Sequence, residues 1–152
     1  MNILILYGTT EGQTRKIAQF MHDRLDDADH RVTIIDAAAA HGSLDPRAFD
    51  VVFIAASLHM ERYQPAVTGF VRRHANGLSH VKAAFVSVSL AAAGHDEEDT
   101  KGLQKCVAEF VHSTGWTPKT VIHVAGAFRF TQYDFSSKAG RCATSPGARM
   151  WT

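Results

Sequence analysis

Residues 2–14 read NILILYGTTEGQT, an apolar run followed by a short loop of hydroxyls and glycines and then by the start of a helix. The nearly continuous apolar character of residues 2–7 is typical of a strand buried on both faces of a sheet. A helix predicted from Thr14 carries unpaired N–H groups and a partial positive charge in its first turn, and short loop residues let an anion approach them. The stretch therefore predicts a site for a phosphate-bearing ligand.

Two common phosphate-binding loops are excluded by the spacing of the glycines. The mononucleotide loop needs a lysine directly after its second glycine, whereas Gly12 is followed by Gln13. The dinucleotide fingerprint needs three glycines in a Gly-x-Gly-x-x-Gly array, which is absent. The remaining pattern, TTEGQT at 9–14, resembles the FMN phosphate loop of flavodoxins, Ser/Thr-x-Thr-Gly-x-Thr/Ser after the first strand. The alternative is an ordinary helix N-terminus capped by Thr10 or Thr14.

The resemblance to flavodoxins implies which groups hold the FMN phosphate. They are side-chain hydroxyls and backbone N–H groups, supplied by Thr9, Thr10, Gly12, Gln13 and Thr14. Glu11 stands where flavodoxins often carry threonine. Because a phosphate would repel its carboxylate, Glu11 is expected to point outward and to offer only its N–H.

Length and composition indicate one globular domain. The chain has 152 residues, of which 45% are hydrophobic and 20% charged. It contains no apolar run long enough to cross a membrane and no signal-peptide pattern, so a cytoplasmic location is expected. The two cysteines are far apart and the nine histidines follow no ligand spacing, so no metal site is expected. Cys106 lies on the apolar face of a predicted helix and is expected in the core.

The net charge of +1, from 16 basic and 15 acidic residues, gives no indication of nucleic-acid binding. Flavodoxins that act as soluble electron carriers are typically strongly acidic, which steers them towards basic partners. This chain has nearly balanced charges and so differs from such carriers.

The hydrophobic pattern predicts five strands, separated by helices or by segments of helical length. The strands are predicted at residues 2–7, 31–36, 50–56, 82–89 and 120–126, and the clearest helices at 14–25, from Pro65 onward and at 100–113. This alternation indicates an α/β fold, a flavodoxin-like, doubly wound, five-stranded parallel sheet with helices on both faces. In such sheets ligands bind at the carboxyl ends of the strands. The loops at 9–14, 57–64 and 89–95 are therefore expected to meet.

The second and third of these loops would enclose the flavin ring in a flavodoxin-like site. The residues expected to contact it are Ser57, Leu58 and His59 after the third strand, and Ser89, Leu90, Ala91 and Ala92 after the fourth. Residues 89–94 include no aromatic side chain, so one face of the ring would stay uncovered. That favours an enzyme that admits a planar substrate over a shielded electron carrier. His59 either bonds to flavin or substrate, or is an exposed loop histidine without a special task.

Several segments together resemble one family. They are residues 6–14, 54–58, 70–75, 84–90 and 124–134, the last reading VAGAFRFTQYD. The chain is similar to the flavodoxin-domain family that includes the menaquinone-dependent protoporphyrinogen dehydrogenases of bacterial haem synthesis. The resemblance implies an FMN enzyme that oxidises protoporphyrinogen IX to protoporphyrin IX and passes electrons to a quinone, with peripheral contact at the inner face of the cytoplasmic membrane. Arg129 would meet a propionate or be a solvated loop residue, and Tyr63 would contact substrate or coat its loop.

The C-terminal residues depart from the family pattern. Residues 1–135 form the predicted FMN-binding domain, whereas 136–152 show no apolar periodicity and are expected to be irregular. The helix that closes the fold in relatives is then missing or altered. A truncated or frame-shifted reading frame would explain this, and so would a homodimer that covers the gap. Two alternatives to the enzyme stay open: an electron-carrier flavodoxin, and a flavodoxin-fold domain that no longer retains FMN.

Overall fold

The computed structural model describes residues 1–10, 12–40, 44–59, 62–89 and 97–125. Five parallel strands form one sheet in the order β2-β1-β3-β4-β5. Their bounds are β1 (Asn2–Tyr7), β2 (Arg31–Asp36), β3 (Val51–Ser57), β4 (Lys82–Ser89) and β5 (Thr120–Ala125). The predicted five-stranded parallel fold is confirmed, with β3 shifted by one residue from its expected position. The predictions for Glu11, Leu90, Ala91, Ala92, Arg129 and the tail at 136–152 lie outside the described residues.

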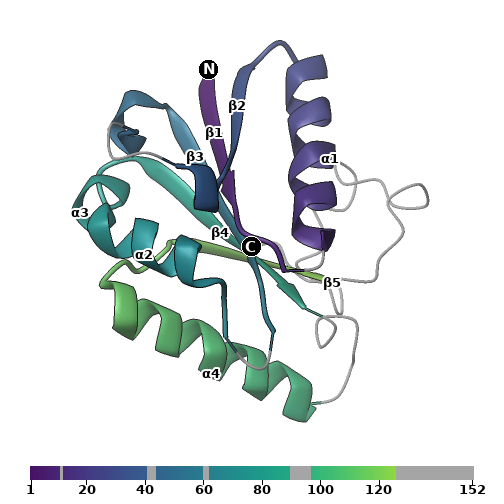
Figure 1. Ribbon diagram of the computed structural model, residues 1–152, viewed down its shortest axis with the longest axis vertical. Helices are drawn as coiled ribbons and strands as arrows, with labels where there is room; N and C mark the ends of the chain where they lie inside the picture. The colour runs from purple at the N-terminus through teal and green to yellow at the C-terminus, as the bar shows by residue number, and fades with distance from the viewer. Residues whose placement is uncertain (11, 41–43, 60–61, 90–96, 126–152) are drawn as a thin grey trace.

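The helices cover both faces of this sheet, as Figure 1 shows. They are α1 (Gln13–Asp27), α2 (Pro65–Arg73), the short α3 (Ala75–Leu78) and α4 (Glu97–Thr114), with single 3₁₀ turns at Ala37–Ala39 and Pro46–Ala48. α1 lies on one face, and α2, α3 and α4 lie on the other. α4 begins three residues before the predicted start at 100.

Alternation along the buried strands divides the core into two clusters. Ile3 and Ile5 of β1 pack against α1, whereas Leu4 and Leu6 pack towards α2 and α4. Cys106, on α4, is buried in the second cluster, as expected. Because successive side chains of a strand point to opposite faces, a continuous apolar run such as 3–6 is the pattern that a sheet covered on both sides requires.

The chain changes direction across the sheet between β1 and β3, and this brings their carboxyl ends together. From β1 the chain passes to β2 on one side, and then crosses to β3 on the other. The N–H of Gly8 donates to the carbonyl of Ala55 at 2.9 Å, and the N–H of Leu58 donates to that of Val88 at 2.8 Å. The loops that follow β1, β3 and β4 therefore begin side by side, at the switch point where doubly wound sheets bind ligands.

Candidate functional site

The loop after β1 turns sharply into α1 at Gly12. This glycine has a φ of 91°, in the left-handed region, and its N–H donates to the hydroxyl of Thr9 at 2.7 Å. The helix begins at Gln13, one residue before the predicted start, and the N–H of Lys16 closes its first turn on the carbonyl of Gly12 at 3.2 Å. A left-handed turn of this kind brings the chain into the helix without a side chain over its N-terminus.

The first turn of α1 contains a polar group whose bonding is incomplete. The hydroxyl of Thr14 is buried, with the residue 0% exposed, and it has no hydrogen-bond partner among the described residues. No described residue accepts from the N–H of Gln13 or Thr14 either, as expected for the first residues of a helix. Arg15 and Lys16, both exposed, add positive charge to the same turn. Because a buried hydroxyl without a partner costs free energy, this cradle fits an anion that accepts hydrogen bonds.

Gln64 connects this loop to the loop after β3, and sequence reasoning missed it. Its side-chain nitrogen donates to the hydroxyl of Thr10 at 2.9 Å and to that of Ser57 at 2.6 Å. Its side-chain oxygen accepts from the N–H of Ser57 at 3.0 Å. Since 54 residues separate Gln64 from Thr10, no local pattern in the sequence could have paired them.

Two residues of the loop after β3, His59 and Arg62, pair through their backbones. The N–H of His59 donates to the carbonyl of Arg62 at 2.8 Å, and the N–H of Arg62 donates to the carbonyl of His59 at 3.1 Å. The side chains of His59 and Arg62 are exposed, whereas Ser57 and Leu58 are half-buried beside the ends of β3 and β4. This backbone pairing fixes the positions of the Cα atoms of His59 and Arg62, and both side chains extend from them into solvent.

Tyr63 lies in the core, which differs from both roles considered for it in the sequence. It is 8% exposed, and its ring packs edge-on against Phe85 and Phe110, with centroids 5.0 and 5.3 Å away. Its hydroxyl is hydrogen-bonded to the hydroxyl of Ser87 at 2.7 Å. Burial raises the pKa of this phenol well above its usual value of 10.0, because the ionised form would lose solvation. These contacts favour a packing role over contact with substrate.

At the end of β4, Ser89 is buried next to Ala125 of β5. It is the one predicted flavin contact after β4 that falls within the described residues. Its position at the carboxyl end of the strand, beside the start of the loop after β3, is the position predicted for it.

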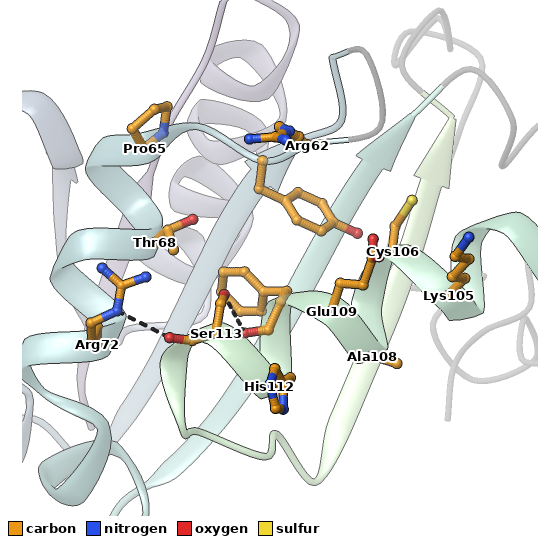
Figure 2. A pocket seen from close by; sticks show the side chains of 12 residues that line it. Arg62, Pro65, Thr68, Arg72, Lys105, Cys106, Ala108, Glu109, His112 and Ser113 are labelled. Atoms are coloured by element: carbon orange, nitrogen blue, oxygen red, sulfur yellow. Dashed lines mark hydrogen bonds between the residues drawn. The ribbon is translucent and has the colours of Figure 1, made fainter.

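A groove with a cavity volume of about 950 Å³ runs between α2 and α4, on the face of the sheet opposite α1 (Figure 2). Arg62 from the β3 loop, Arg72 from α2 and Lys105 from α4 give its walls positive charge, and Glu109 is its one described carboxylate. The guanidinium Nε of Arg72 donates to the carbonyl of Ser113 at 3.0 Å. No described carboxylate forms an ion pair with Arg62 or Lys105. The groove is therefore suited to a ligand that carries negative charge.

Direct hydrogen bonds thus join Gly12 to Thr9, and join Gln64 to both Thr10 and Ser57. Thr14 and Gln13 follow directly in the first turn of α1. Among the described residues, no group of three or more histidine, cysteine or acidic side chains could hold a metal ion. No helix in the described part of the chain is long and apolar enough to span a bilayer.

Comparison with known proteins gives matches over most of the chain. The flavodoxin domain family matches residues 4–139. A protoporphyrinogen IX dehydrogenase [quinone] of Escherichia coli K12 is 33% identical over 135 residues, which cover 88% of this chain and 72% of that protein. One of the same name from Leishmania major is 29% identical over 133 residues, 87% of this chain and 57% of that protein. A flavodoxin from Pseudomonas aeruginosa superposes with a TM-score of 0.61 at 15% identity, over 86% of this chain and 88% of its own.

Proposed function

The chain belongs to the flavodoxin domain family, and from this premise we propose that it is an FMN-dependent oxidoreductase that oxidises protoporphyrinogen IX with a quinone as acceptor. Relatives at 33% and 29% identity carry the name of that reaction. A quinone that dissolves in lipid would be met at the inner face of the cytoplasmic membrane, where we place turnover. We propose that residues 1–135 form the domain that does this work, and a homodimer stays a prediction.

The observation that carries the proposal is the buried hydroxyl of Thr14 without a described partner. A terminal monophosphate matches the cradle, because it can accept from this hydroxyl and from the N–H groups of Gln13 and Thr14 at once. FMN ends in such a monophosphate. Gly12 supports the same ligand, since a side chain at its φ of 91° would be strained.

The residues of the chain have binding and orienting roles in this proposal. Bound FMN supplies the capacity to accept hydride or electrons from the substrate and to pass them on. The phosphate is held by hydroxyls and backbone N–H groups of the loop after β1, which we assign to Thr9, Thr10, Gly12, Gln13 and Thr14, and Glu11 offers its N–H. The ring is enclosed by residues of the two loops that follow β3 and β4, namely Ser57, Leu58, His59, Ser89, Leu90, Ala91 and Ala92. No side chain is assigned as a general acid or base.

Arg62 is the described side chain that we propose for contact with substrate, in addition to Arg129 from the sequence. It is exposed at one end of the charged groove, and its backbone forms two hydrogen bonds with the backbone of His59. Protoporphyrinogen carries propionate carboxylates, and a guanidinium recognises carboxylates through paired hydrogen bonds. Tyr63 is left out of this role because it is buried.

The proposal is tested first by the visible absorbance of the purified protein, before and after incubation with FMN and desalting. A bound-flavin spectrum, followed by formation of protoporphyrin from protoporphyrinogen with a quinone, is the expected result. Retained flavin without porphyrinogen oxidation would favour the electron-carrier flavodoxin. A colourless protein that cannot be reloaded would favour the domain that no longer retains FMN.

Arg62→Gln is expected to raise the KM for protoporphyrinogen about tenfold and to leave kcat and FMN affinity nearly unchanged. A charge-assisted hydrogen bond contributes about 1.5–3 kcal/mol, and its loss from ground state and transition state alike changes KM alone. Steady-state kinetics in the porphyrinogen assay measures this. Arg31→Gln, an exposed position on β2 far from the loops, is the matched control. Equal KM values in all three proteins would remove Arg62 from the substrate site.

A further inference from the structure

We propose that Gln64 is a positioning residue of the flavin site, which sets the direction in which the hydroxyls of Thr10 and Ser57 donate their protons. This role rests on the proposed function, because it assumes a flavin phosphate at the loop after β1. The carboxamide lies between that loop and the loop after β3, and it is bonded to both.

The side chain of Gln64 is held firmly. The residue is 9% exposed, and its three side-chain hydrogen bonds measure 2.6, 2.9 and 3.0 Å. Its backbone carbonyl accepts from the N–H groups of Val67 and Thr68, each at 3.1 Å, because Gln64 occupies the N-cap position of α2. A side chain anchored to a helix start and to two loops has little freedom to rotate.

The hydrogen-bonding partners fix which way the carboxamide points. The backbone N–H of Ser57 can only donate, so the group that meets it at 3.0 Å must be the side-chain oxygen of Gln64. The side-chain nitrogen is then forced towards the two hydroxyls, and it uses its two N–H groups on Thr10 and Ser57. The reverse orientation would place a nitrogen against a backbone N–H, and both are donors.

This orientation has a consequence for the two hydroxyls. Each accepts a hydrogen bond from Gln64, so each keeps its own proton for another partner. A hydroxyl that accepts one bond is also polarised to donate a stronger one. Thr10 lies in the phosphate loop, two residues before Gly12, and Ser57 ends β3 where the flavin ring is proposed. Gln64 would thus turn Thr10 into a donor for the phosphate and Ser57 into a donor for the flavin.

Gln64→Glu tests this role, because it keeps the shape of the side chain and replaces its two N–H donors by an acceptor. The hydroxyls of Thr10 and Ser57 would then donate to the introduced carboxylate and turn their protons away from the ligand. The carboxylate would also repel the phosphate. We expect the Kd for FMN to rise at least about tenfold, and the Kd for riboflavin, which lacks the phosphate, to rise clearly less.

The Kd values for FMN and riboflavin are measured by fluorescence quenching for wild type, Gln64→Glu and the charge-matched control Gln104→Glu, an exposed position on α4. A general loss of structure would weaken both ligands together, so the ratio of the two Kd values isolates the positioning role. Gln64→Met, which has neither donors nor charge, should lower the FMN preference by a smaller factor and serves if Gln64→Glu does not fold.

An FMN-to-riboflavin ratio in Gln64→Glu and Gln64→Met equal to that of wild type would overturn the positioning role while leaving the proposed function intact. Wild-type protein that binds neither flavin would overturn the proposed function and this role with it. A selective loss of FMN in the Gln64 variants, with Gln104→Glu unchanged, supports both.

Discussion

Thr14→Ala combined with Gly12→Val should give a folded protein that no longer retains FMN through desalting. Thr14 supplies the buried hydroxyl that has no described partner, and a hydrogen bond to a charged group contributes about 1.5–3 kcal/mol. Gly12 has a φ of 91°, and a β-branched residue there is strained by about 1–3 kcal/mol. That strain pulls the turn away from the geometry that admits the phosphate. Together the changes should weaken FMN binding by roughly 100-fold or more.

The far end of α4 offers a matched control for this variant. Gly115 also has a positive φ, at 80°, with open space around the position of a Cβ, and Thr117 nearby is exposed. Gly115→Val combined with Thr117→Ala therefore introduces the same strain and removes one hydroxyl, at a distance from the loops after β1 and β3. It should lose similar stability in urea unfolding and keep its FMN. Full FMN affinity in the Thr14 and Gly12 variant would remove the phosphate-loop assignment.

The strands and the phosphate turn could be predicted because their signals are local. A continuous apolar run such as 2–7 marks a strand buried on both faces, and the hydroxyl and glycine spacing that follows it marks the turn. The order of the strands then follows from the rules of doubly wound sheets, so the meeting of the loops after β1 and β3 could be predicted as well.

The contacts between loops could not be predicted, because they depend on distances in space and not along the chain. Gln64 is one polar residue in a polar loop, and only the fold reveals that it is buried between Thr10 and Ser57. Tyr63 similarly has polar neighbours along the chain, Arg62 and Gln64, which are typical of an exposed loop. Its burial depends on Ser87, a partner 24 residues away on β4 that bonds its hydroxyl.

Gly8→Ala should destabilise the protein by about 2 kcal/mol, the second large effect that we expect. A Cβ on Gly8 would overlap Cγ2 of Val67 and lie 3.1 Å from Cβ of Gln64. The backbone cannot retreat easily, because the N–H of Gly8 donates to the carbonyl of Ala55 at 2.9 Å. Overpacking of this kind typically costs about 1–3 kcal/mol. The free energy of unfolding from urea titration measures it.

Gly102→Ala is the same change of glycine to alanine, but at this position we expect it to stabilise the protein. Gly102 is exposed inside α4, and nothing lies within 4 Å of its Cβ position. Alanine stabilises an exposed helix interior by about 1 kcal/mol relative to glycine. The free energy of unfolding should therefore rise in Gly102→Ala and fall in Gly8→Ala. A Gly8→Ala protein as stable as wild type would show that α2 moves to make room for the methyl group without loss of folding free energy.

Val67→Ala in the Gly8→Ala background distinguishes the clash with Val67 from a general disturbance of the loop. Val67 is fully buried, so Val67→Ala alone should lose stability by leaving a cavity. In the double variant the new methyl group on residue 8 occupies part of the space that Cγ2 leaves. The double variant should then be more stable than the sum of the two single losses predicts, by about 1 kcal/mol or more. Simple additivity of the two losses would mean that the cost of Gly8→Ala arises from contact with Gln64 instead. The displaced carboxamide would then no longer bond Thr10 and Ser57. In that case FMN affinity should fall together with stability.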